Sequence, residues 1–303
     1  MNQEVLTIEN LTKVYGKLKA LDKLSISIER GNIYGILGPN GSGKTTTLGI
    51  VLDAINASSG SYKWFGNEPS KAERKKVGAI LETPVFYPYM SGQKNLEIIA
   101  DIKGVSYDQI PEVLETVNLT ERKHSKFRTY SLGMKQRLAI AAALIGNPEA
   151  LILDEPTNGL DPQGIAEIRN LIKKIASDGL TIVLASHLLD EVQKVCSHVV
   201  VLEKGKKLFA GKVDEVLSDS VQVEIAGPEM HKIEAVLSSS DFINKFEKEE
   251  QMFLVELKKG FDSSILNKSL FEQGIQVSHV SLRKKSLENY FLELLAESHD
   301  KTS

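Results

Sequence analysis

The chain has 303 residues, which is enough for about two domains of ordinary size. Its composition, 42% hydrophobic and 25% charged, is that of a globular protein and excludes a fibre or a disordered chain. The formal net charge is −3, so no general positive field exists to attract nucleic acid or an anionic membrane. We therefore expect no nucleic-acid partner.

The cellular compartment can be inferred from cysteine usage and from the apolar runs. One cysteine, Cys196, cannot form an internal disulfide, and the first residues lack the layout of a signal peptide. The longest apolar runs, such as 138–146 and 181–186, are far shorter than the ~18 to 20 residues that cross a bilayer. We expect a cytoplasmic chain that would need a separate spanning partner to work at a membrane.

The first two thirds of the chain alternate between strand and helix patterns. Short β-branched segments predict early strands at 6–8, 24–28, 33–37, 61–65 and 77–81. Helical periodicity follows from 95 to about 147, with breaks expected near Pro111 and over 121–129 and a last helix from about 135 to 145. Apolar strands are then predicted at 150–153, 181–185 and 198–202, with a helix over 163–177. Apolar strands alternating with helices predict an α/β fold with a mainly parallel sheet.

The last third has a different character. Residues 214–303 carry a net charge of −7, which leaves +4 for the first 213. Predicted strands at 221–225 and 252–257, each followed by a helical stretch, indicate a small α+β domain. Near the end, one helical face carries the apolar side chains of Leu287, Tyr290, Phe291, Leu294 and Leu295. We interpret this stripe as core, with a partner-binding face as the alternative.

A glycine-rich segment at 38–45 matches the phosphate-loop pattern G-x-x-x-x-G-K-[ST] between a strand and a helix-compatible run. Backbone N–H groups of such a loop converge on phosphate, Lys44 can reach the β and γ oxygens, and Thr45 can bind Mg²⁺. A chance glycine-rich turn is the alternative. The residues expected to contact a nucleoside triphosphate are Gly38, Pro39, Asn40, Gly41, Ser42, Gly43, Lys44, Thr45 and Thr46.

Three polar residues follow buried strands. Asp154 and Glu155 follow the apolar strand at 150–153, and His187 follows the strand at 181–185. With a phosphate loop, an acid at a strand end can hold Mg²⁺, and a second carboxylate can activate water. We expect Asp154 to bind the metal, Glu155 to act on water, and His187 to reach the γ-phosphate. Without that loop, these residues would only mark the solvent ends of strands.

These motifs, together with Tyr130-Ser131-Leu132-Gly133-Met134 shortly before the Asp-Glu strand, resemble the ATP-binding subunit of an ABC transporter. Ser131 and Gly133 match the L-S-G-G-Q signature of that family, while Tyr130, Leu132 and Met134 depart from it. The resemblance implies a P-loop NTPase fold: a mainly parallel sheet, an antiparallel subdomain and a helical subdomain at about 84–147. It implies an ATP-binding domain at 1–215 and leaves an accessory domain at 216–303.

The resemblance also assigns single residues. It implies that Tyr15 stacks on adenine, that Asp161 acts across a dimer, and that His187 is the switch histidine. In the family two subunits pack head to tail, so Ser131 and Gly133 would close on ATP held by the other subunit. Glu82 stands where the family normally has a glutamine that contacts Mg²⁺. This variant is similar to the ATPases of lantibiotic self-protection and bacitracin-resistance exporters, although neutral drift is an alternative.

Taken together, the expected function is ATP hydrolysis in a bacterial ABC exporter of antimicrobial peptides or drugs. The implied partners are ATP, Mg²⁺, a second copy of the chain and a separate membrane permease, which would hold the chain on the inner face of the membrane. The alternatives are a soluble ABC-type ATPase and an ATP-dependent regulator that is not coupled to transport.

Overall fold

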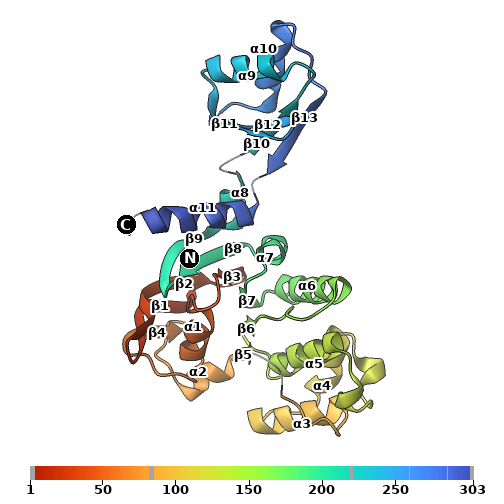
Figure 1. Ribbon diagram of the computed structural model, residues 1–303. Coiled ribbons are helices and arrows are strands. Elements are labelled where there is room, and N and C mark those ends of the chain that lie inside the picture. The colour runs from red at the N-terminus through yellow and green to blue at the C-terminus, as the bar shows by residue number, and fades with distance from the viewer. Residues whose placement is uncertain (1–3, 82–84, 219–220, 259, 285, 301–303) are drawn as a thin grey trace. The chain divides into compact units, whose positions relative to one another are not determined.

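The computed structural model describes residues 4–81, 85–218, 221–258, 260–284 and 286–300. The chain divides into two compact units, Met1–Gly211 and Lys212–Ser303, which are described separately below (Figure 1). Within the described ranges, no helix is long and apolar enough to cross a membrane.

The first unit contains nine strands, seven α-helices and two short 3₁₀ helices over its described residues. In chain order they are β1 (Glu4–Tyr15), β2 (Leu18–Glu29), β3 (Ile33–Leu37), α1 (Lys44–Val51), β4 (Ser59–Trp64), α2 (Lys71–Lys75), β5 (Val77–Ile80), α3 (Gly92–Lys103), α4 (Gln109–Thr116), η1 (Thr120–Arg122), η2 (Phe127–Thr129), α5 (Leu132–Leu144), β6 (Ala150–Asp154), α6 (Pro162–Ser177), β7 (Thr181–Ser186), α7 (Leu189–Val195), β8 (His198–Glu203) and β9 (Lys206–Lys212).

A six-stranded sheet in the order β5-β6-β7-β3-β8-β9 forms the centre of this unit. The pairs β5/β6, β6/β7, β7/β3 and β3/β8 are parallel, which confirms the expected sheet. Every residue of β3, β6 and β7 is buried, and this explains their unbroken apolar sequences, since helices cover both faces of such a sheet.

A second, antiparallel sheet has the order β2-β1-β4 and confirms the expected antiparallel subdomain. Its apolar side chains share one buried cluster with α1 and with the parallel sheet. Trp64 is fully buried there, and its indole Nε1 donates to the carbonyl oxygen of Val51 at 2.8 Å. That bond ties the last residue of α1 to the antiparallel sheet.

The helical segment refines two sequence expectations. The expected break near Pro111 lies a few residues earlier, between α3 and α4, because Gly104 ends α3 in the left-handed conformation at φ 68°. Pro111 itself lies in the first turn of α4, where a missing N–H costs nothing. The helix expected from about residue 135 begins at Leu132, because the Ser131 hydroxyl caps it.

One close approach in this unit requires a glycine. A Cβ on Gly35 of β3 would lie 2.5 Å from Val192 Cγ1 and 3.1 Å from Cys196 Sγ. The helix α7 can therefore pack directly on the strand. Cys196 is buried by this packing, and burial raises the pKa of its thiol well above the ordinary value.

The second unit follows a β-α-β-β-α-β plan with a flanking helix at each end. Its elements are α8 (Val213–Ser218), β10 (Val221–Ala226), α9 (Met230–Ser239), β11 (Ile243–Glu249), β12 (Met252–Leu257), α10 (Ser263–Glu272), β13 (His279–Lys284) and α11 (Leu287–Asp300). The four strands form an antiparallel sheet in the order β11-β12-β10-β13, and α9 and α10 share one apolar core with it. This is the ferredoxin-like arrangement, and it confirms the expected small α+β fold. The helix α11 packs against α8, and Leu287 at its start is buried. The interpretation of the rest of its apolar stripe as core stays a prediction.

A lysine at the end of α3 closes the end of α5. Lys103 Nζ donates to the carbonyl oxygens of Ala142, Ala143 and Ile145 at 3.1, 3.2 and 2.6 Å. These carbonyls belong to the last turn of α5, which has no helical donors for them. Burial lowers the pKa of Lys103 to about 8, because desolvation disfavours the ammonium form.

This pKa predicts a pH effect on stability. The pKa of an unfolded lysine is about 10.4, so between about pH 8 and 10 the unfolded chain binds more protons here, and stability rises with pH. Relative to Lys103→Met, the wild type should gain up to about 3 kcal/mol in free energy of unfolding across that range. Urea unfolding at several pH values measures it. Lys94→Met removes an exposed lysine from the same helix as a control, and a wild-type minus Lys103→Met difference that stays constant with pH would contradict the prediction.

Candidate functional site

The predicted polar residues meet at the carboxyl edge of three neighbouring strands. The register pairs Leu37 of β3 with Ser186 of β7, and Asp154 of β6 with Ala185 of β7. The segments that follow these strands therefore emerge at the same edge. They are the glycine-rich loop, Glu155 and His187.

The glycine-rich loop has the backbone geometry of a phosphate cradle. Gly41 and Gly43 have φ values of 80° and 105°, which favour glycine. A Cβ on Gly38 would lie 2.3 Å from the carbonyl oxygen of Leu202, so the loop also requires glycine for space. Gly43 is the N-cap of α1 and makes no side-chain capping bond, which leaves the first amides of the helix facing the loop.

Two polar side chains of the loop are buried and arranged for an anion. Lys44 Nζ donates to the carbonyl oxygens of Gly38 at 2.7 Å and Pro39 at 3.4 Å, and the residue is 6% exposed. Ser42 Oγ is buried and has no hydrogen-bond partner among the described residues. A phosphate in the loop would give this hydroxyl a partner.

A hollow of about 330 Å³ lies over the loop, within the size range of small-molecule sites. Tyr15 and Glu155 lie at its walls together with loop residues 40–46. Tyr15 is 46% exposed, and Lys13 Nζ lies 4.8 Å from the centre of its ring. An exposed aromatic ring beside a phosphate cradle is suited to stacking on a base.

Glu155 and His187 form a hydrogen-bonded pair at this hollow. His187 Nδ1 lies 2.8 Å from Glu155 Oε2, although the residues are 32 positions apart. The backbone N–H of Glu155 donates to the carbonyl oxygen of Ala185 at 2.9 Å, and φ of Glu155 is 49°. A non-glycine residue in that region is strained, and such strain is concentrated at functional sites.

The oxygen donors expected for a metal ion lie at the same edge. Asp154 is the last residue of β6 and is 4% exposed, and Thr45 is the second residue of α1. A carboxylate and a hydroxyl, completed by phosphate oxygens and water, suit Mg²⁺. Glu82, the third expected ligand, lies outside the described residues.

Three predicted residues lie away from this hollow, at two helix starts. Ser131 is the N-cap of α5, and its Oγ accepts from the N–H of Met134 at 3.2 Å. Gly133 is the second residue of that helix. Asp161 is the N-cap of α6, and its Oδ1 accepts from the N–H of Gly164 at 2.8 Å. The hollow over the loop therefore lacks the signature residues of its own chain.

Tyr130, which departs from the family signature, has a structural role. Its hydroxyl donates to the carbonyl oxygen of Arg122 at 2.7 Å, and the side chain is buried. Burial raises the pKa of Tyr130 above the ordinary value, so it stays a neutral donor. This bond fixes the start of the signature against the preceding turn.

Comparison with known proteins decides the family. Residues 21–158 match the family model described as ABC transporter. The chain is 37% identical to the bacitracin transport ATP-binding protein BcrA of Bacillus licheniformis, over 96% of this chain and 97% of that protein. The chain belongs to the ABC transporter ATP-binding family. It is the ATP-binding, ATP-hydrolysing subunit of an ABC transporter.

Two further relatives extend this result. The lantibiotic transport ATP-binding protein SrtF of Streptococcus pyogenes is 40% identical over 69% of this chain and 92% of that protein. A solved dimer of an ATP-binding cassette, in a post-hydrolysis state with ADP and Pi, is 26% identical with a TM-score of 0.61. It covers 69% of this chain and 98% of that chain. ABC ATPase subunits dimerise and work with membrane permeases.

The hollow of this ABC subunit also contains two residues that sequence reasoning missed. Leu18 and Ala20, at the start of β2, line it beside Tyr15. Leu18 is 66% exposed. Exposure is visible only after folding, so the sequence held no signal that could identify it.

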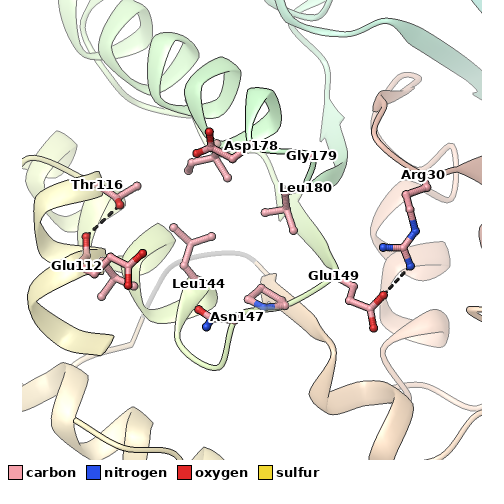
Figure 2. Close-up of a pocket in the computed structure, with 12 residues that line it drawn as sticks. Arg30, Glu112, Thr116, Leu144, Asn147, Glu149, Asp178, Gly179 and Leu180 are labelled. Atoms are coloured by element: carbon pink, nitrogen blue, oxygen red, sulfur yellow. Dashed lines mark hydrogen bonds and ion pairs between the residues drawn. The ribbon is translucent and has the colours of Figure 1, made fainter. Parts of the chain in front are cut away.

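A second hollow, of about 350 Å³, lies near the amino ends of β3, β6 and β7 (Figure 2). It is lined by α4, by the ends of α5 and α6, and by an ion pair between Arg30 and Glu149 at 2.5 Å. None of the predicted nucleotide residues lines it. The carboxyl edge therefore remains the predicted place of the ATP chemistry.

Proposed function

We propose that this ABC subunit powers a bacterial exporter of antimicrobial peptides or drugs and is held on the inner face of the membrane by a separate permease. The observation that carries the catalytic part is the Glu155–His187 pair at the phosphate-loop hollow. The names of the relatives BcrA and SrtF support the cargo class.

Glu155 and His187 would have different roles in hydrolysis. His187 holds Glu155 Oε2, and Oε1 has no hydrogen bond among the described residues, so it is available to orient and deprotonate a water molecule. His187 Nδ1 serves the carboxylate, so only Nε2 remains for the γ-phosphate. Nε2 donates a hydrogen bond to the γ-phosphate when both ring nitrogens carry a proton.

The phosphate loop would stabilise the negative charge on the phosphoryl group that is transferred. Lys44 exchanges the carbonyl oxygens of Gly38 and Pro39 for β- and γ-phosphate oxygens. Thr45 and Asp154 would hold Mg²⁺, which neutralises charge on the transferred phosphoryl group. Tyr15 would stack on the adenine.

The signature residues require a second copy of the chain. Ser131, Gly133 and Asp161 lie outside the hollow formed by their own loop, so we propose a head-to-tail homodimer in which each signature meets the partner's ATP. The start of α5 offers backbone N–H groups for the γ-phosphate.

The substitution Glu155→Gln tests the catalytic proposal. The amide keeps the size of the side chain but cannot accept a proton, so ATP should still bind while turnover falls at least about 100-fold. ATP-dependent dimers should then accumulate in size-exclusion chromatography. Glu149→Gln alters a carboxylate at the other end of β6 and serves as a control. ATPase activity near the wild-type value in Glu155→Gln would overturn the assignment.

An exposed apolar surface next to α3 suits the permease. Val85, Tyr87, Tyr89 and Met90 are 93%, 57%, 73% and 42% exposed. The backbone of Tyr87 and of Met90 is nonetheless held in place: Asn95 Oδ1 accepts from Tyr87 N at 2.7 Å, and Met90 O accepts from Phe127 N at 2.8 Å. Several exposed apolar side chains close together in the sequence are a feature expected of an interaction site.

A charge on this surface should weaken docking to the permease. We expect Val85→Asp to reduce the membrane-bound fraction of the chain about tenfold, because a carboxylate would be buried without a partner. Nucleotide binding should be unchanged. Phe271→Asp, at an 80% exposed position of α10, is the control. Equal membrane fractions in the two variants would contradict this docking site.

The cargo class is tested in cells. Deleting the gene should lower tolerance to bacitracin or to a lantibiotic, and the wild-type gene, but not Glu155→Gln, should restore it. The measurement is the inhibitory concentration for a panel of both compound classes. Unchanged tolerance across the panel would refute the cargo and leave the ATPase assignment intact.

A further inference from the structure

A basic segment lies beside the exposed apolar surface next to α3. It comprises residues 122–128, from the end of η1 into η2. Backbone hydrogen bonds in both directions join it to the segment that carries the apolar side chains. Arg128 N donates to Pro88 O at 2.9 Å. In the opposite direction, Gln93 N donates to Lys123 O at 2.9 Å. The two segments therefore form one surface of the first unit.

Positive charge is concentrated in the basic segment. Its lysine and arginine side chains are those of Arg122, Lys123, Lys126 and Arg128. Three of them are exposed, and Lys123 is half-buried. None of them makes an ion pair with a residue that the structure describes, whereas Lys94 on the adjoining α3 pairs with Glu97 at 2.5 Å. Like charges that lie close together without counter-ions repel one another, so an anionic partner would stabilise this surface.

The basic and the apolar side chains meet at Tyr89. Arg128 Cζ lies 5.7 Å from the centre of the Tyr89 ring, and Tyr89 is 73% exposed. Met90, the next residue, is 42% exposed. Tyrosine is enriched at membrane–water interfaces, because its ring can contact apolar chains while its hydroxyl stays in water. An exposed tyrosine beside basic groups without ion pairs therefore has the composition of a membrane-contacting surface.

The sign of the charge distinguishes between the two partners that a membrane offers. Cytoplasmic loops of membrane proteins carry an excess of lysine and arginine, so a permease loop would on average repel the basic segment. The cytoplasmic leaflet is instead negatively charged, and it attracts clusters of about four or more basic residues. Charge complementarity therefore favours lipid headgroups as the partner of the basic segment.

We propose that the basic segment binds anionic lipid headgroups of the cytoplasmic leaflet directly, beside the surface that contacts the permease. Its ammonium and guanidinium groups pair with the lipid phosphates, and Tyr89 lies at the level of the headgroups. This inference extends the proposed function, because only a chain held on the inner face of the membrane meets that leaflet. The lipid contact itself needs no permease, so the two contacts can be tested separately.

Binding of the full-length chain to lipid vesicles without permease tests the inference. The vesicles consist of phosphatidylcholine alone, or of phosphatidylcholine with about 30% phosphatidylglycerol. The chain should bind the anionic vesicles at least about tenfold more tightly than the neutral ones. Raising NaCl from about 0.1 M to about 0.5 M should weaken this binding, because salt screens exposed charges. Flotation in a density gradient measures the bound fraction.

Substitutions in the basic segment test the role of its charges. The combination of Lys123→Gln, Lys126→Gln and Arg128→Gln removes three positive charges and should weaken binding to the anionic vesicles at least about tenfold. The combination of Lys123→Arg, Lys126→Arg and Arg128→Lys keeps the charges, so its binding should stay within about twofold of the wild type.

A matched control changes the net charge elsewhere in the same unit. Lys71, Lys173 and Lys174 are exposed residues of α2 and α6. Replacing all three by glutamine makes the same change in net charge and should leave vesicle binding within about twofold of the wild type, because only a local cluster binds the leaflet. ATP binding, measured for every variant, shows that the chain is folded.

Several outcomes would overturn the lipid contact. They are equal binding of the wild type to the two kinds of vesicle, wild-type binding by the glutamine variant of the basic segment, and an equal loss in the control variant. Binding to a single-stranded oligonucleotide that is tighter than binding to the vesicles, and that is lost in the glutamine variant, would assign the segment to nucleic acid instead.

Native membranes that contain the permease separate this inference from the proposed function. If the glutamine variant binds vesicles like the wild type but is lost from these membranes, the basic segment contacts the permease, and the lipid contact is refuted. If Val85→Asp and its control are equally membrane-bound while the vesicle results hold, the proposed permease surface fails and the lipid contact stands.

Discussion

The parallel register of β3, β6 and β7 is the constraint on which the nucleotide site depends. Backbone hydrogen bonds align Leu37, Asp154 and Ser186 at one edge, and all three strands are buried on both faces. A slip of one residue would move a strand end by about 3.3 Å and reverse its side chains. The 2.8 Å bond between Glu155 and His187 would then be lost. The relative positions of Glu155 and His187 thus depend on the pairing of the strands more than on the loops in which these residues lie.

The phosphate loop keeps its shape through groups that the nucleotide would later replace. A buried ammonium group needs acceptors, and Lys44 finds them in the carbonyl oxygens of Gly38 and Pro39. The backbone of the loop is therefore hydrogen-bonded to the side chain of its own lysine. Phosphate oxygens can take over that role without rebuilding the backbone, since Gly41 and Gly43 already have the required conformations. Preorganisation of this kind lowers the entropy cost of binding.

Strand positions and the phosphate loop could be predicted because their signals are local. The strand at 33–37 has the same bounds in the sequence prediction and in the structure. Helix ends differed from the prediction where a neighbouring residue decides them: the capping bond of Ser131 begins α5 early, and Gly104 ends α3 some residues before Pro111. The edge strands β9 and β11 were missed, because strands rich in exposed charges lack an apolar pattern. The edge strand β13 was also missed. The bond between Glu155 and His187 depends on register, which no local pattern encodes.

The burial of Cys196 beneath α7 has a practical consequence for spectroscopy. A thiol that is buried and kept protonated reacts slowly, because the thiolate is the nucleophile. The native chain should therefore react only very slowly with maleimide reagents. If a cysteine were introduced at one exposed position, nearly all of a fluorophore or spin label would attach to it. Cys196 would not have to be replaced, so the close packing between Gly35 and α7 would be kept. Distances between two labelled copies could then be followed through the ATP cycle in a chain whose interior is unaltered.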